Sequence, residues 1–242
     1  MFYKQISILF ITMLFSISGV LSQSSGYAWG VKVGPSLITQ KWKSYNRALT
    51  TQYHADIFID SYNEESANSL YGQLGYHIRG SSDRSAYHII NGQSFKTHVN
   101  KYLFENIVLE LGFKKRNLWQ DKITSILGFG IRGEYTIGTN LNEFEAINDQ
   151  YTLPVYAIDA FVKPFNYGMS LLAGIEYPIA DLYEIFATLS FAQDFSRQYY
   201  QPPVPGFFND QYGNRRSIGD VTAYNTSIEL SVGIRIYRIR EY

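Results

Sequence analysis

The carboxyl-terminal segment from Thr226 to Arg238 alternates apolar and polar side chains. Its apolar positions are Ile228, Leu230, Val232, Ile234 and Ile236, and the positions between them are Glu229, Ser231, Gly233, Arg235 and Tyr237. Successive side chains of a β-strand point to opposite faces, so the segment predicts a strand with one apolar face and one charged face. In a soluble sandwich the apolar face would meet a shared core. In a membrane barrel it would meet lipid, and the charged face would line the lumen.

Seven further segments alternate in the same way, and they cover residues 27–34, 53–60, 70–79, 103–115, 127–137, 167–177 and 183–194. Together with the last segment they make about eight strands of roughly 9 to 14 residues, long enough to cross a bilayer at a tilt. The joins between the second and third, fourth and fifth, and sixth and seventh strands are short. The other joins are long and cover residues 37–51, 80–102, 138–165 and 196–223.

This regular exchange of short and long joins predicts an all-β fold, a closed up-and-down antiparallel β-barrel of about eight strands that spans a membrane. The topology of a Greek-key sandwich does not require short and long joins to alternate. With the amino terminus in the periplasm, the long loops are expected to be extracellular and the short turns periplasmic. Both chain termini are then expected in the periplasm, and the bacterial outer membrane is the expected location.

Residues 1–22 combine Lys4, an apolar run over residues 6–15 and small residues ahead of Gln23. This pattern predicts a secretory signal peptide. A transmembrane anchor is the alternative, but the unbroken apolar run is shorter than the roughly 20 residues that a spanning helix needs. Residues 23–242 are then expected to form one outer-membrane β-barrel domain.

Aromatic residues make up 17% of the chain, with 21 Tyr and 16 Phe. Tyrosine is favoured where an apolar ring lies in acyl chains and its hydroxyl reaches the headgroups, which suits a barrel. The mean hydropathy of -0.17 argues against a helical bundle in lipid. The net charge is zero, so there is no electrostatic case for nucleic acid, and the lack of cysteine excludes disulfides and a lipid anchor on cysteine.

Several short segments resemble the PorT-like outer-membrane β-barrel family. They are GYHIRGS at 75–81, GIRGEYTIGT at 130–139, FNYG at 165–168, DFSRQY at 194–199, QPP at 201–203 and, in the first strand, WGVKVG at 29–34. Tyr242 is similar to the aromatic end residue that barrel-assembly machinery recognises in such proteins. The resemblance implies an outer-membrane barrel with a part in envelope biogenesis or protein secretion.

The inward faces of the predicted strands carry many ionisable groups. They are Lys32, Asp56, Asp60, Arg79, Glu110, Lys114, Arg132, Glu134, Glu176, Glu229 and Arg235, with Glu184 on the same face. A barrel of about eight strands is just wide enough inside for side chains to fill it. Charges there must pair, because an unpaired ion out of water costs several kcal/mol. We therefore expect a network of ion pairs that plugs the lumen, and a narrow ion path is the alternative.

An outer-membrane enzyme acting on lipid or peptide is a second hypothesis. It would use His54 with Asp56, or His77, together with a hydroxyl such as that of Ser190. The sequence has no Gly-x-Ser-x-Gly motif, no cluster of histidine and cysteine with metal-ligand spacing and no phosphate-binding loop. We therefore expect a protein without catalytic residues, cofactor or metal.

The loops carry an aromatic and basic set that is typical of a recognition surface. The candidate recognition residues are Tyr199, Tyr200, Phe207, Phe208, Tyr212, Arg215 and Arg216, with further loop aromatics at Trp42, Tyr45, Tyr151 and Tyr156. The alternative is that these rings lie in the headgroup belt or fold back as a lid over the barrel mouth.

The sequence as a whole predicts a monomeric, non-enzymatic outer-membrane barrel. Its expected partners are outer-membrane lipid and other envelope proteins, which its loops or turns would contact. The alternatives that stay open are an outer-membrane enzyme, a small channel and a secreted soluble β-sandwich.

Overall fold

A computed structural model of the chain describes residues 26–43, 47–62, 67–83, 87–90, 93–96, 99–120, 122–144, 157–209 and 215–239. The predicted signal peptide at residues 1–22, together with Tyr45, Tyr151, Tyr156, Tyr212 and Tyr242, lies outside the described residues. Within the described ranges, no helix is long and apolar enough to cross a membrane.

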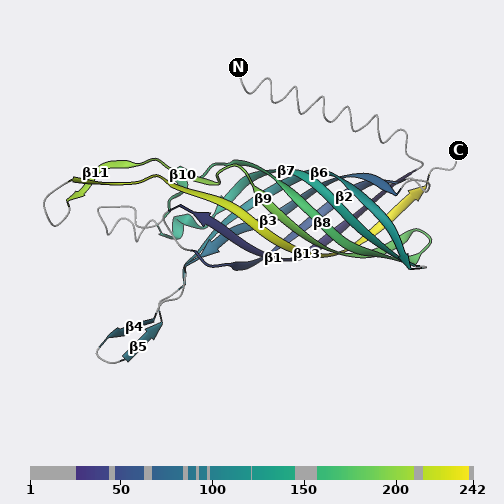
Figure 1. Cartoon of the computed structure of the whole chain (residues 1–242), viewed down its shortest axis with the longest axis horizontal. Coiled ribbons are helices and arrows are strands. Elements are labelled where there is room, and N and C mark those ends of the chain that lie inside the picture. Colours follow the sequence, from purple (N-terminus) through teal and green to yellow (C-terminus); the bar gives the residue numbers. More distant parts are fainter. Residues whose placement is uncertain are drawn as a thin grey trace, which may run out of the picture.

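Eight long antiparallel strands close into a ring (Figure 1). They are β1 (Gly26–Trp42), β2 (Thr50–Tyr62), β3 (Asn68–Ser82), β6 (Lys101–Gln120), β7 (Ile123–Thr139), β8 (Phe165–Ala180), β9 (Tyr183–Asp194) and β13 (Val221–Ile239). Each strand pairs with its neighbours in chain order, and β1 pairs with β13 to close the cylinder. The predicted up-and-down barrel of eight strands is therefore confirmed.

The two ends of the barrel differ. At the turn end, short joins link β2 to β3, β6 to β7 and β8 to β9, and Gly26 of β1 pairs with Ile239 of β13. The loop end carries β4 (Tyr87–Ile90) with β5 (Gln93–Lys96), β10 (Tyr199–Gln201), β11 (Val204–Asn209) with β12 (Arg215–Ile218), and the short 3-10 turns η1 (Leu141–Phe144) and η2 (Asp159–Phe161). Figure 1 shows the two small hairpins projecting beyond the cylinder at this end.

Several strands are longer than the predicted 9 to 14 residues. β6 has 20 residues and β13 has 19, and β1 continues through Trp42 into what the sequence predicts as a loop. Ile38, Gln40 and Trp42 keep the inward phase of β1 and are buried, but polar residues mixed into this stretch hide the alternation. The first long loop is correspondingly shorter than predicted, and the strands extend past the apolar zone at the loop end.

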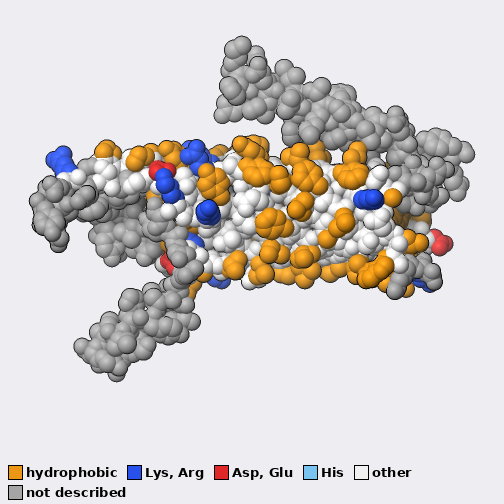
Figure 2. Space-filling model, in the orientation of Figure 1, with side chains coloured by type: hydrophobic (Ala, Val, Ile, Leu, Met, Phe, Trp, Pro, Cys, Tyr) orange, Lys and Arg blue, Asp and Glu red, His pale blue; other side chains and the backbone are white. Residues whose placement is uncertain are grey.

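The exterior of the cylinder is apolar and exposed. Outward side chains at mid-strand are large, as at Leu127, Ile131 and Val232, which are 59%, 57% and 57% exposed. Figure 2 shows hydrophobic side chains spread over the cylinder wall. Because the inward faces are polar and charged, this arrangement inverts that of a soluble protein, so acyl chains are the medium that suits the wall. A sandwich with a shared apolar core does not fit it.

Glycines on the inward face let neighbouring strands approach. A Cβ at Gly34 of β1 would overlap the carbonyl oxygen of Leu230 on β13, and one at Gly30 would overlap that of Ile234. These contacts lie at the seam where the first and last strands close the ring. Any side chain there would push the seam apart, so both positions require glycine.

Candidate functional site

The lumen of the barrel is the candidate site, because the chain's ionisable groups converge there. All eleven charged residues that the sequence predicts for the interior are buried, none more than 8% exposed: Lys32, Asp56, Asp60, Arg79, Glu110, Lys114, Arg132, Glu134, Glu176, Glu229 and Arg235. Strict alternation along each strand places them inside. Ten of them divide into a turn-end cluster and a loop-half cluster, and Glu110 lies with the aromatic rings between the two.

The turn-end cluster joins five strands. Its members are Asp60, Lys114, Arg116, Glu176, Glu184 and Arg235. Arg235 of β13 lies at its centre, with Nη1 at 2.5 Å from Glu176 and 2.7 Å from Glu184, and Nη2 at 2.9 Å from Asp60. Arg116 of β6 bridges Asp60 at 3.1 Å and Glu176 at 2.9 Å. Three cations thus face three carboxylates.

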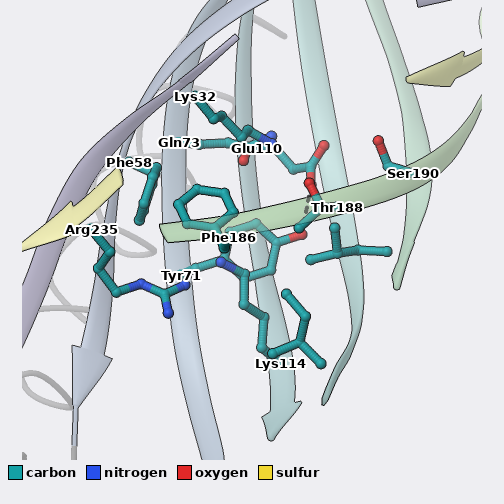
Figure 3. Close-up of a pocket in the computed structure, with 12 residues that line it drawn as sticks. Lys32, Phe58, Tyr71, Gln73, Glu110, Lys114, Phe186, Thr188, Ser190 and Arg235 are labelled. Carbon is teal, nitrogen blue, oxygen red and sulfur yellow. Dashed lines mark hydrogen bonds between the residues drawn. The ribbon is translucent and has the colours of Figure 1, made fainter. Parts of the chain in front are cut away.

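An aromatic layer lies beside this cluster (Figure 3). The rings of Phe58 and Phe186 meet edge to face with their centroids 5.3 Å apart. Arg235 lies 5.2 Å from the Phe186 ring, and Lys114 Nζ lies 4.4 Å from the ring of Tyr71. Cations are attracted to the faces of aromatic rings, so the layer and the cluster stabilise one another. Tyr71 donates a hydrogen bond of 2.6 Å to Glu110.

The cavity within this layer is small. Its volume is about 10 Å³, which is room for one water molecule, and Lys32, Phe58, Tyr71 and Arg235 are among the side chains that line it (Figure 3). Side chains therefore fill most of this layer of the lumen.

The loop-half cluster links strands on opposite sides of the ring. Its members are Lys32, Asp56, His77, Arg79, Arg132, Glu134 and Glu229. Arg79 of β3 pairs with Glu134 of β7 at 2.9 Å and with Glu229 of β13 at 2.6 Å. Arg132 also reaches Glu134, at 2.8 Å. Lys32 Nζ is 3.7 Å from Asp56.

Two stacked histidines complete the interior. The rings of His54 and His77 lie 5.2 Å apart, from the adjacent strands β2 and β3. His54 contacts the hydroxyls of Ser36 and Ser231, each at 2.8 Å, and His77 contacts Asp56 at 2.9 Å. A catalytic triad needs one histidine between a hydroxyl and a carboxylate. In this structure the hydroxyls contact the ring of His54, and the carboxylates of Asp56 and Glu229 contact the ring of His77.

Ser190, the hydroxyl weighed for catalysis, lines the central cavity with Glu110 and Thr188. His54 contacts Ser36 and Ser231 instead. Across the described part of the chain, no three His, Asp or Glu side chains are grouped so as to hold a metal ion.

A hydrophobic cluster closes the loop end of the lumen. This mouth cluster consists of Trp42, Tyr102, Phe104, Leu141, Phe144, Ala157, Tyr199, Val221 and Ala223. The ring of Trp42 lies 5.2 Å from that of Tyr199, and its Nε1 donates hydrogen bonds to Gln40 at 3.2 Å and Ser81 at 3.1 Å. Arg47 covers the Tyr102 ring at 3.9 Å.

The mouth cluster corrects one predicted recognition residue. Tyr199 is 0% exposed and packs against Trp42, so its ring lies inside the mouth cluster and not on the surface. The alternation of β10 places Tyr199 inward and leaves Tyr200 partly exposed. Arg215 is exposed on β12, and the backbones of Phe208 and Arg216 pair in the β11–β12 hairpin, which also contains Phe207.

Sequence reasoning missed Arg116, which holds the turn-end cluster together. The predicted strand ended at Lys115, one residue before Arg116, whereas β6 runs to Gln120 and Arg116 continues the inward phase of Glu110 and Lys114. Following the alternation one step further would have found it. The hydrogen bonds that Asn225 Nδ2 donates to Asp194 and Gln198 were also missed, because Asn225 precedes the predicted start of the last strand at Thr226 and Gln198 lies in a predicted loop.

No protein-family model matches the sequence, and the curated proteins include no match. Solved structures with a similar fold include Neisserial surface protein A, NspA, at 11% identity and a TM-score of 0.45, covering 88% of this chain and 97% of NspA. OprG from Pseudomonas aeruginosa has 6% identity and a TM-score of 0.46, covering 88% of this chain and 99% of OprG. The outer membrane protease OmpT from Escherichia coli has 8% identity and a TM-score of 0.40, covering 89% of this chain and 98% of OmpT.

At these identities the likeness concerns the fold alone. The strand pairing of this chain itself shows the closed up-and-down barrel, and the likeness assigns it no activity. What the site itself offers is a set of ion pairs that cross the lumen.

Proposed function

We propose that this protein is a non-enzymatic, monomeric β-barrel of the bacterial outer membrane that presents its loop-end elements to other envelope proteins. The observation that carries the proposal is the ion pairing of Arg79 with Glu134 and Glu229, which ties three strands together across the lumen. A barrel filled in this way is a rigid support. The PorT-like segments support a role in envelope biogenesis or protein secretion, and membership of that family is part of the proposal.

The filled lumen argues against a channel. Two charged clusters, an aromatic layer and the mouth cluster follow one another along the axis, and the central cavity has room for about one water molecule. An ion crossing this interior would have to displace paired charges, which is costly out of water.

The proposed orientation puts the turn end in the periplasm and the loop end outside the cell. A signal peptide would deliver the chain to the periplasm, and β1 starts and β13 ends at the same end of the cylinder. Both termini then stay on the periplasmic side, as in an up-and-down barrel with an even number of strands.

The loop end is the better-suited contact surface. The hairpins β4–β5 and β11–β12 project past the cylinder there (Figure 1). Main-chain edges and exposed side chains such as Arg215 offer hydrogen-bonding groups to a partner.

Planar-bilayer recording of the purified protein tests the plugged lumen. We expect a silent bilayer, while a 16-stranded porin in the same apparatus should show conductance steps. Reproducible steps from this protein would show that the lumen conducts and would overturn that part of the proposal.

Photo-cross-linking in intact cells tests the contact surface. A photoreactive residue at Arg215 should give adducts with envelope proteins, whereas one at the lipid-facing Leu230 should give lipid adducts only. Protein adducts from Lys122 at the turn end, with none from Arg215, would move the contact surface to the periplasmic side. The absence of protein adducts from both would reject a role in protein contact.

A further inference from the structure

Exposed cations gather on the outer wall at the loop end, where β1, β13 and β10 meet. This basic patch consists of Lys41, Lys43, Lys163 and Arg197, with Tyr200 among them. Figure 2 shows Lys and Arg side chains gathered toward the loop end of the apolar wall.

The patch is continuous across the strands. Lys41 of β1 pairs with Tyr224 of β13, and the backbone of Lys43 donates a hydrogen bond of 3.0 Å to Thr222. Tyr200 of β10 lies opposite the same Thr222. Residues from the two sides of β13 therefore share one stretch of surface.

The tyrosine ring organises the other two cations. The guanidinium of Arg197 lies 4.6 Å from the centroid of the Tyr200 ring, and Lys163 Nζ lies 5.7 Å from it. The backbone of Lys163 also donates a hydrogen bond of 2.8 Å to the carbonyl of Gln198. Two positive side chains are thus held close together at one aromatic ring.

The patch lies directly above the apolar wall. Leu37 and Ile228 are cross-strand partners, 47% and 44% exposed, and they begin the apolar zone on β1 and β13. Lys41 is four residues further along β1. At a rise of about 3.3 Å per residue and a strand tilt of about 40°, this places the patch roughly 10 Å above the apolar edge, at headgroup depth.

The patch carries excess positive charge. Asp220 is the acidic neighbour that the described contacts place in it, and it pairs with Lys43. The hydrogen bond from Lys43 lowers the pKa of Asp220 below its ordinary value, and Arg197 acts in the same direction. Four cations and one carboxylate leave a surface suited to phosphate groups.

We propose that the basic patch binds the phosphate groups of lipid headgroups in the leaflet at the loop end, in particular those of phosphorylated glycolipid. This inference rests on the proposed membrane orientation. Lys41, Lys163 and Arg197 would contact phosphate, Tyr200 and Tyr224 would lie beside the glycerol or sugar part, and the acyl chains would follow the apolar wall below. Basic clusters at the membrane surface recognise anionic headgroups in this way.

The test titrates the purified protein in neutral detergent with phosphorylated glycolipid and counts bound lipid by native mass spectrometry. The triple variant Lys41→Gln, Lys163→Gln, Arg197→Gln should bind about 100-fold more weakly, since each cation near an anionic surface contributes roughly fivefold. The matched control Lys115→Gln, Lys122→Gln, Arg238→Gln removes three exposed cations at the turn end and should change affinity less than twofold.

Dephosphorylated glycolipid and inorganic phosphate distinguish the sources of binding. Wild type and the triple variant should bind dephosphorylated glycolipid with equal affinity. Inorganic phosphate should compete with the phosphorylated glycolipid only at high concentration. Equal affinities of wild type and triple variant would overturn the inference, as would equal binding of the dephosphorylated lipid. If the protein fails to insert into vesicles at all, the proposed membrane location fails instead.

Discussion

Arg79 of β3 and Glu229 of β13 form an ion pair of 2.6 Å although β1 and β2 stand between their strands in the ring. The same guanidinium donates to Ser227 at 2.9 Å and pairs with Glu134 on β7. One side chain thus connects three parts of the wall through the centre of the barrel. A pair of this kind restrains the shape of the whole cross-section, which wall hydrogen bonds between adjacent strands cannot do.

Removing Arg79 should strongly destabilise the barrel. Arg79→Met leaves Glu134 and Glu229 to share Arg132, and breaking a buried ion pair costs about 3–5 kcal/mol. Denaturant unfolding in micelles should show this loss. Lys43→Met, which breaks the exposed pair with Asp220, should change stability far less, because water and salt screen a surface ion pair. A further change, Glu229→Gln in the Arg79→Met background, should restore part of the loss; an additive further loss would mean that the two groups are not coupled.

A charge on the middle of the outer wall should interfere with insertion. Val232 is 57% exposed, so a soluble fold would tolerate Val232→Arg, but at the centre of a bilayer the change costs about 2–4 kcal/mol. Thr226→Arg, near the loop end of the same strand, should cost about 0–1 kcal/mol. Refolding of each variant into lipid vesicles measures the free-energy cost of the two substitutions. Equal stability of the two variants would contradict the assignment of this wall to lipid.

A methyl group at the seam should disturb closure of the ring. In Gly34→Ala the new Cβ would overlap the carbonyl oxygen of Leu230, and overpacking of this kind costs about 1–3 kcal/mol or more. Gly133→Ala is the matched control, because its Cβ would meet only the Phe165 ring at 3.7 Å. Heat-dependent mobility on gels and denaturant unfolding report barrel closure. The seam argument fails if Gly34→Ala is as stable as the control.

Loss of Trp42 should loosen the loop end and leave the barrel intact. Trp42→Ala removes the ring that packs on Tyr199 and Tyr102 and the donor to Gln40 and Ser81, at a cost of about 3–5 kcal/mol to that region. Limited proteolysis should then cut the loop end sooner, while the barrel keeps its heat-resistant mobility. Trp119→Ala, at a side chain that is 70% exposed, should change neither. Unchanged proteolysis in Trp42→Ala would show that the mouth cluster does not protect the loops.

The sequence by itself determined the faces of the strands and the order of the joins. Alternation is a local property with a period of two, so the placement of Leu230 and Glu229 on opposite faces follows from the strand alone. The exchange of short and long joins then restricts the topology to an up-and-down ring. Polar residues break the pattern around Gln40, and the predicted strand ends before Arg116. At such places the alternation does not show where the strand ends.

Only the tertiary structure decided which inward charges meet. Arg79 and Glu229 are 150 residues apart, and their contact depends on how the strands are staggered when the ring closes. The same closure places the hydroxyl of Ser231 beside His54 and the carboxylate of Glu229 beside His77. Alternation assigns a side chain to a face, but its height and its partner across the lumen depend on the register of all eight strands together.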